Sequence, residues 1–435
     1  MSTLAEVRLW GKTIGAVSLE DGEDVASFEY DAAFAESGIQ VAPIVMPLSR
    51  RVYRFPELSR PTFFGLPGML ADSLPDKFGT ALIDAWLASE GRQPHSFNAI
   101  ERLCYTGERG IGALEFAPAI GPRAKQTTHI EVGKLVELAS EVLTHRSNLQ
   151  ASFGAEGKED ALKDILRVGT SAGGARAKAV IAWNPKTNEV RSGQVRAGKG
   201  FEYWLLKFDG VSGNRDKELE DPAGYGLIEY AYYRMALACG IDINECRLFK
   251  ENGRSHFMTR RFDRLDTGEK RHMQSLGALA HYDYNMAGAY SYEQALLVMR
   301  QLELPMQTIE QQFRRTVFNI VARNQDDHVK NIAFLMNKSG EWSLSPAFDV
   351  TYSFNPAGAW TASHQMTMNG KRDNFTMEDF SACAKTASMK RGRAAKILAE
   401  VQATVANWPS YAEEAGVPGD VLEKIQRTLN LKPYS

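Results

Sequence analysis

Hydrophobic and polar residues alternate near the beginning of the chain, whereas towards its end hydrophobic residues recur every three or four positions. Residues 6–10 and 13–19 are two alternating runs that flank the turn Gly11-Lys12, so we expect a β-hairpin there. Residues 27–30 predict a third strand. Residues 290–302 instead carry hydrophobic side chains at helical spacing. The pattern therefore predicts strands first and helices last.

The middle of the chain mixes the two periods. A helix is expected over residues 130–146, and strands are expected over residues 201–208 and 255–264. Between these strands, Asp221 and Pro222 predict the N-cap and first residue of a helix. Beyond residue 349 we expect an irregular stretch and then helices, which are predicted over residues 394–407 and 421–431.

The strongest candidate chemistry follows a helix predicted over residues 308–324. Asp326 is followed five positions later by Asn331, and Asp349 comes after a hairpin predicted over residues 331–345. Protein kinases place a catalytic aspartate, an asparagine and a second aspartate in this order. The pattern predicts phosphoryl transfer, with Asp326 as the base for a substrate hydroxyl and Mg²⁺ held by Asn331 and Asp349.

Two other interpretations of this motif stay open. Asp and Asn favour turns, so residues 326–331 can be only a polar loop. A hydrolytic metal site on Asp326, Asp327 and His328 is the second alternative, but three adjacent side chains point in divergent directions and converge poorly on one ion.

Two further features indicate a nucleotide lobe. Small residues at positions 169–175 let backbone amides approach phosphate oxygens, and Lys178 in the following strand adds a positive charge. Lys207 lies in a hydrophobic strand and Glu229 in the next helix, which is how kinases pair the lysine that holds ATP phosphates. A flexible loop and two unrelated surface charges are the alternatives.

A Walker A motif is excluded. Residues 193–200 match its spacing, but Gly200 replaces the Ser or Thr that binds magnesium, and a strand follows where a helix is required. We therefore reject a P-loop NTPase.

The composition of the chain limits the kinds of partner that we expect it to bind. The 435 residues include 51 basic and 53 acidic ones, so no strong global charge attracts nucleic acid, and DNA contact would need a local patch or a partner. The four cysteines lack metal-type spacing, which indicates reduced thiols. We see no signal peptide and no hydrophobic run of roughly 20 residues, so we expect a cytoplasmic protein without a membrane contact.

Taken in order, these motifs resemble those of the HipA toxin-kinase family. The resemblance rests on the glycine loop, Lys207, Glu229, the R-x-F-D-R connector at residues 260–264 and the D-x-H-x-K-N and F-D motifs. It covers nearly the whole chain, including a G-x-x-G-A-L segment at Gly107–Leu114. It implies an α+β, two-lobed, protein-kinase-like fold. We divide the chain into a β-rich N-terminal subdomain (residues 1–125), a nucleotide-binding lobe (126–262) and a mainly helical lobe with the catalytic loop (263–435).

The resemblance also implies functional residues and partners. Asp326 would be catalytic with His328 beside it, Asn331 and Asp349 would bind Mg²⁺, and Ser171 would be autophosphorylated, which we expect to inactivate the enzyme. The predicted ATP-binding residues are Ala172, Gly173, Gly174, Ala175, Lys178, Lys207, Glu229, Arg260, Phe262, Asp263, His328 and Lys330. The implied partners are a helix-turn-helix HipB-like antitoxin, operator DNA through that antitoxin, and a protein substrate such as glutamyl-tRNA synthetase.

The chain also departs from the family pattern. Arg176 and Ala177 stand where members often have Gln and Glu, Asp327 where they have Gly, and Arg260 where they have Glu. Val350 replaces the glycine of the kinase D-F-G motif, so that motif's switch is not expected. Two rival functions remain: a kinase for a small molecule or lipid head group, and an idle co-repressor that clamps an antitoxin on DNA.

Overall fold

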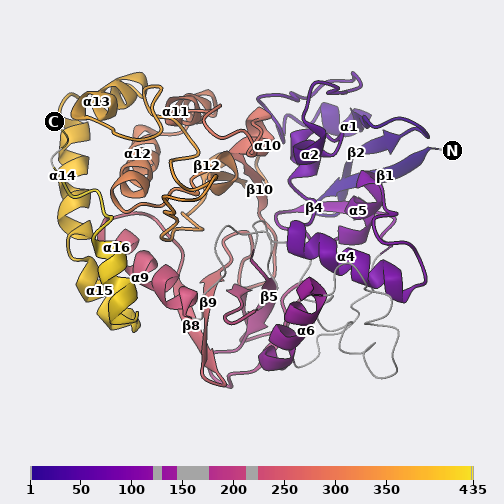
Figure 1. Cartoon of the computed structure of the whole chain (residues 1–435). Coiled ribbons are helices and arrows are strands. Elements are labelled where there is room, and N and C mark those ends of the chain that lie inside the picture. Colours follow the sequence, from indigo (N-terminus) through magenta and orange to yellow (C-terminus); the bar gives the residue numbers. More distant parts are fainter. Residues whose placement is uncertain (1, 121–129, 145–175, 212–223, 433, 435) are drawn as a thin grey trace.

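The computed structural model describes residues 2–120, 130–144, 176–211, 224–432 and 434. They form three antiparallel sheets and a set of helices that become more frequent towards the C-terminus (Figure 1). This confirms the predicted α+β class, with a β-rich beginning and a mainly helical end. Ser171, residues 172–175 of the glycine loop, Asp221 and Pro222 lie outside the described residues.

The N-terminal subdomain is built on a four-stranded sheet in the order β3-β2-β1-β4. Alternation buries Val7 and Leu9 of β1 and Phe28 of β3, so one face of the sheet joins a hydrophobic core. The predicted hairpin and third strand are confirmed. The strands are β1 (Thr3–Leu9), β2 (Lys12–Leu19), β3 (Ser27–Tyr30) and β4 (Leu114–Ala117), and the helices are α1 (Ala32–Ala35), α2 (Arg60–Phe63), α3 (Gly68–Ala71), α4 (Lys77–Ser89) and α5 (Ala99–Thr106).

The second sheet has five strands in the order β6-β5-β7-β9-β8. Lys207 at the end of β7 lies opposite Lys178 of β5 and Phe257 of β9, so it occupies a central strand. The strands are β5 (Lys178–Trp183), β6 (Val190–Ser192), β7 (Glu202–Lys207), β8 (Cys246–Glu251) and β9 (Arg254–Arg260), and the helices are α6 (Val132–Thr144) and α9 (Tyr225–Ala238).

Helix α9 begins later than predicted. Its N-cap is Gly224, in the left-handed region at a φ of 93°, and not Asp221. The Gly224 amide donates to Oδ1 of Asp209 at 2.9 Å, so a carboxylate from the segment after β7 replaces the local cap that the sequence suggested. This contact fixes the start of the helix that carries Glu229.

The C-terminal lobe packs helices around one large core. The predicted helices are present as α11 (Tyr292–Gln301), α12 (Met306–Val321), α14 (Arg393–Val405) and α16 (Gly419–Gln426). The predicted irregular stretch after Asp349 is present as far as Thr376, but helix α13 (Met377–Thr386) was not predicted, and a capping box that joins Thr376 to Asp379 starts it. The other elements are α10 (Leu276–Ala280), α15 (Trp408–Ala415), the 3₁₀ helix η1 (Val329–Asn331), β10 (His272–Ser275), β11 (Ala333–Met336) and β12 (Trp342–Leu344).

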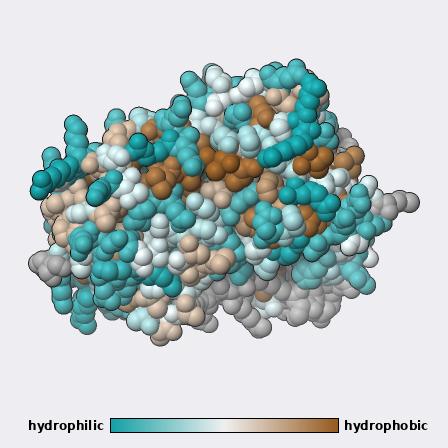
Figure 2. Space-filling model, turned by 90° about the horizontal axis from the view of Figure 1, so that it is seen from above, coloured by the Kyte–Doolittle hydropathy of each residue, from teal (hydrophilic) through white to brown (hydrophobic). Residues whose placement is uncertain are grey.

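The face of the molecule that is seen from above is largely hydrophilic, and a hydrophobic band crosses its middle (Figure 2). All four cysteines are buried, and none forms a disulfide. Among the described residues, no helix is long and hydrophobic enough to cross a membrane.

Candidate active site

The candidate site lies where the second sheet meets the loop that follows α12. Helix α12 ends at Val321, and the chain then runs through Asp326 into η1 and β11. Strands β11 and β12 pair in antiparallel register, with Phe334 opposite Leu344, so the hairpin returns the chain to Asp349. The predicted hairpin is confirmed, and it turns the chain back from Asn331 to the segment that carries Asp349.

Lys207 links the two lobes at this site. Its Nζ lies 2.5 Å from Oε1 of Glu229 on α9 and also donates to Oδ1 of Asp349. The Glu229 side chain is 1% exposed and that of Lys207 is 9% exposed, so the pair is shielded from water. The predicted pair of strand lysine and helix glutamate is therefore present, and it extends to the aspartate of the opposite lobe.

Neighbouring charges set the protonation states of Lys207 and Asp349. Burial alone would raise the pKa of Asp349, but the positive charges of Lys207 and then Lys178 outweigh it and lower the pKa to about 2. Burial likewise opposes the charged form of Lys207, yet Asp349 and Glu229 raise its pKa above the ordinary value. Both partners are thus ionised at neutral pH, as phosphate binding and metal binding require.

Asp326 presents its carboxylate at the surface of the site. Its side chain is 46% exposed, and Oδ1 accepts a hydrogen bond of 2.7 Å from Nε1 of Trp360. Nε2 of His328 lies 3.8 Å from the same oxygen. One carboxylate oxygen is therefore held in place, while the side chain remains accessible to a substrate hydroxyl.

Asn331 is held by the loop that it closes. Its Nδ2 donates to the backbone oxygen of Asp326 at 2.8 Å, which fixes the donating end of the amide. The amide oxygen is then the end that can act as a ligand. Asn331 and Asp349 together offer hard oxygen donors from two segments, and this donor set suits Mg²⁺ when phosphate oxygens and water complete it.

Asp327 points away from the site into the core. It accepts hydrogen bonds from the hydroxyl of Tyr292, from Nδ1 of His364 at 2.7 Å and from the amide of Gln365 at 2.7 Å. Among the described residues no group of three His, Cys, Asp or Glu side chains could hold a metal ion. This geometry argues against a hydrolytic metal site on Asp326, Asp327 and His328. Asp327 instead anchors the loop to the core.

The two other predicted lysines have acidic neighbours from the N-terminal subdomain. Nζ of Lys178 lies 3.3 Å from Oδ2 of Asp76, the N-cap of α4, and both side chains are buried. Nζ of Lys330 lies 3.9 Å from Oδ1 of Asp72, and its side chain is 33% exposed. The positive charge of Lys178 also helps to lower the pKa of Asp349, so Lys178 lies near that carboxylate.

The connector residues have different roles. Arg260 is directed to surface carboxylates, including Oδ1 of Asp266 at 2.6 Å. The ring centre of Phe262 lies 5.7 Å from that of Phe348, next to Asp349. Asp263 is buried and accepts from the amide of Gly112 at 2.8 Å, so its carboxylate serves the contact between the connector and the N-terminal subdomain.

Some residues at the site carry no local signal in the sequence. Trp360 holds Asp326 from 34 positions away, in a stretch without a recognisable motif. Arg176 lies 3.6 Å from Glu229, with its guanidinium 4.2 Å from the centre of the Tyr225 ring. These contacts depend on the tertiary fold, and the sequence distinguishes only Arg176, as a departure from a family pattern.

Comparisons with known proteins agree with this architecture. Two family models match the chain: the HipA N-terminal domain over residues 5–117 and the HipA-like C-terminal domain over residues 170–408. The HipA structure solved with HipB and operator DNA from the Shewanella oneidensis MR-1 toxin–antitoxin system superposes with a TM-score of 0.67. It is 16% identical, and the match covers 98% of this chain and 95% of that chain.

A second solved structure is more distant. The Helicobacter pylori proinflammatory kinase CtkA matches with a TM-score of 0.35 and 11% identity, over 59% of this chain and 90% of that chain. No curated protein sequence matches the chain. The full-length match to the Shewanella protein shows that both chains share one two-lobed fold.

Proposed function

Because the chain belongs to the HipA family, we propose that it is an ATP- and Mg²⁺-dependent serine/threonine protein kinase that acts as the toxin of a toxin–antitoxin pair. The observation that carries this proposal is the chain of contacts from Glu229 through Lys207 to Asp349, together with the 46% exposed carboxylate of Asp326 in the loop after α12. Such a group can hold phosphates at one end and orient a hydroxyl at the other.

Each residue would have a defined task. Lys207, kept charged and positioned by Glu229, would bind phosphate oxygens of ATP. Asp326, oriented by Trp360, would accept the proton of the substrate hydroxyl. Asn331 and Asp349 would hold Mg²⁺, which supplies charge neutralisation on the phosphates. Since Asp349 is paired to Lys207, nucleotide binding would exchange this ion pair for contacts to phosphate and metal.

The partners follow from the same family. The Shewanella HipA was solved with HipB and operator DNA, and we propose a HipB-like antitoxin for this chain, with DNA contact through it. We further propose a cytoplasmic protein substrate, with glutamyl-tRNA synthetase the first to test, and autophosphorylation at Ser171. An autophosphorylated Ser171 would add roughly two negative charges beside the ATP phosphates and so switch the enzyme off.

The test is phosphate transfer from labelled ATP to the chain itself and to purified glutamyl-tRNA synthetase. Asp326→Asn and Asp349→Ala should each lower the rate by at least about 100-fold, because one removes the base and the other a metal ligand. Asp420→Asn, a change of an exposed carboxylate on α16, is the matched control and should retain the rate. Full activity in either active-site variant would refute the assignment. Wild-type protein that fails to bind ATP would favour the idle co-repressor instead.

A further inference from the structure

Beneath the catalytic loop lies a small cavity of about 30 Å³, with polar and hydrophobic side chains in its wall. Helix α12 contributes Gln312, Arg315 and Asn319 to its wall, and the loop contributes His328 and Asn331. The three residues of α12 are three and four positions apart, so they share the face of the helix that is turned towards the loop. The cavity therefore lies between a buried helix and the residues proposed for phosphoryl transfer.

Three residues that line the cavity each have a buried side-chain atom without a hydrogen-bond partner among the described residues. These atoms are Oε1 of Gln312, Nε of Arg315 and Nδ1 of His328. Gln312 is 2% exposed and Arg315 is 8% exposed, so bulk water does not reach these groups freely. A buried polar group without a partner is unfavourable, and several around one cavity indicate a bound polar species.

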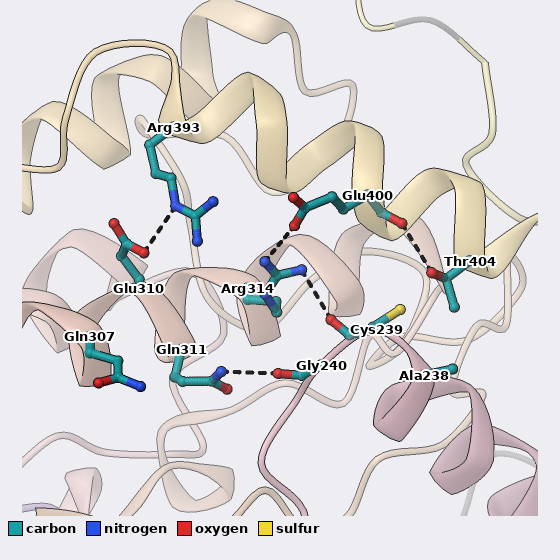
Figure 3. A pocket seen from close by; sticks show the side chains of 10 residues that line it. All are labelled: Ala238, Cys239, Gly240, Gln307, Glu310, Gln311, Arg314, Arg393, Glu400 and Thr404. Atoms are coloured by element: carbon teal, nitrogen blue, oxygen red, sulfur yellow. Dashed lines mark hydrogen bonds and ion pairs between the residues drawn. The ribbon is translucent and has the colours of Figure 1, made fainter.

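Polar residues elsewhere on the same helix are paired. A wider surface cavity of about 520 Å³ lies between α12, α14 and the end of α9 (Figure 3). There Arg314 donates to Glu400 at 2.5 Å and Gln311 donates to the backbone oxygen of Gly240 at 2.9 Å. Some polar groups of α12 are thus paired directly, whereas Gln312 and Arg315, which line the small cavity, each keep an unpaired buried atom.

We propose that one ordered water molecule binds in the small cavity and joins α12 to the catalytic loop. A water molecule can accept one hydrogen bond and donate two. The Nε–H of Arg315 would donate to it, and Oε1 of Gln312 and Nδ1 of His328 would accept from it. A volume of about 30 Å³ has room for such a molecule. An anion is disfavoured because Asp327 also lines the cavity, and a cation is disfavoured by Arg315.

The water has a consequence for Asp326. When it donates to Nδ1 of His328, the neutral ring carries its proton on Nε2, the atom that lies 3.8 Å from Oδ1 of Asp326. The ring then presents an N–H to the carboxylate that is proposed to accept the substrate proton. Gln312 and Arg315 are thereby positioning residues, which act on Asp326 through the water and His328.

This inference rests on the proposed function only for its kinetic effect, so the first measurement does not require activity. The full-length protein is labelled with ¹⁵N-histidine, and the His328 signals are assigned by their loss in His328→Gln. We expect the tautomer with the proton on Nε2 in the wild type. A crystal structure at high resolution should show one water bonded to the three atoms. The other tautomer in the wild type, or a cavity without water, would overturn the proposal even if no kinase activity is found.

The second measurement uses Gln312→Met, which removes one acceptor and fills part of the cavity. The His328 signals should shift towards a mixture of tautomers, and kcat should fall about tenfold with a smaller change in KM for ATP. Gln307→Met is the matched control, because Gln307 is exposed at the wider cavity on the same helix. An unchanged tautomer in folded Gln312→Met would contradict the bridging role of this side chain.

Discussion

Lys207 lies between two carboxylates that come from different lobes. One of them, Glu229, is almost fully buried, and the other, Asp349, is 29% exposed. In the proposed mechanism, the buried carboxylate of Glu229 would hold the lysine, whereas the partly exposed carboxylate of Asp349 would give up its ion pair when a nucleotide binds. The difference in exposure would then leave one lysine fixed in place and still available to phosphate.

Lys207→Met should therefore affect both activity and stability. We expect phosphate transfer to fall at least about 100-fold, because the phosphates lose their cation. The free energy of unfolding should fall by about 3 kcal/mol, because two carboxylates lose their buried partner. Labelled ATP and chemical denaturation measure the two effects. Lys199→Met, in the exposed turn before β7, is the control, and an equal loss in both variants would contradict the role of Lys207.

The pH dependence of stability follows from the pKa of Asp349. Its pKa is about 2 in the folded chain, below the ordinary value of 3.8, so its ionised form stabilises the fold above pH 3.8. This contribution is lost as the pH falls from about 4 towards 2. Asp349→Asn should thus be less stable than the wild type at pH 7, by about 1–2 kcal/mol, and the difference should narrow below pH 4. A difference that stays constant between pH 7 and pH 3 in denaturation experiments would argue against the ion pair.

At the scale of elements, α13 depends on one buried carboxylate. Asp379 accepts hydrogen bonds from the amide of Thr376 at 2.7 Å, from Lys371 at 2.8 Å and from Asn369 at 2.8 Å. Burial opposes its ionisation, but Lys371 and these amides lower its pKa to about 2. The carboxylate therefore caps the helix and also ties the preceding irregular stretch to it.

Asp379→Asn should lower the free energy of unfolding by about 2 kcal/mol at pH 7. The reason is that the amide cannot accept from all these donors and carries no charge for Lys371. Denaturation of the variant can be compared with Glu378→Gln, which changes an exposed carboxylate in the same first turn. A loss of stability in Glu378→Gln alone would show that the helix depends on a charge at its N-terminal dipole and not on the Asp379 cap.

The elements also show what the sequence could predict. Strands β1 to β3 and helices α11 and α12 follow from alternation and helical spacing, because each buries one regular face. The start of α9 did not follow, since its cap comes from Asp209 and the left-handed Gly224. Helix α13 could have been found from Thr376 and Asp379, whose spacing is that of a capping box.

The sequence predicts those residues of the candidate site that belong to one motif along the chain. Asp326, Asn331 and Asp349 lie in one motif, and a hairpin brings the last two towards each other. The sequence did not reveal Trp360 as the partner of Asp326 or Asp76 as the partner of Lys178, because these contacts join distant segments. Local patterns predict the groups proposed to react, whereas the groups that orient them come from the tertiary fold.

At the scale of the whole molecule, one buried cluster joins the N-terminal subdomain to the connector between the lobes. Asp263 accepts from Arg261 at 2.6 Å, from Arg264 at 2.8 Å and from the amide of Gly112 at 2.8 Å. Arg264 also donates to the backbone oxygen of Gly110 at 2.7 Å. Although burial opposes it, the two arginines lower the pKa of Asp263, so the carboxylate remains ionised and holds both.

Asp263→Asn distinguishes a positioning role from the ATP contact that the sequence predicted for this residue. If Asp263 joins the N-terminal subdomain to the connector, its replacement leaves two buried arginines without their shared carboxylate. The free energy of unfolding should then fall by about 3–5 kcal/mol. The KM for ATP of the folded variant should then change little. Chemical denaturation and the ATP dependence of phosphate transfer measure the two quantities, with Asp266→Asn as the control, since Asp266 is exposed and pairs with Arg260 at 2.6 Å. A raised KM without a loss of stability would instead indicate that Asp263 contacts the nucleotide. The N-terminal subdomain would then be held mainly by its other contacts to the C-terminal lobe, such as the hydrogen bond between the Gly68 amide and His281.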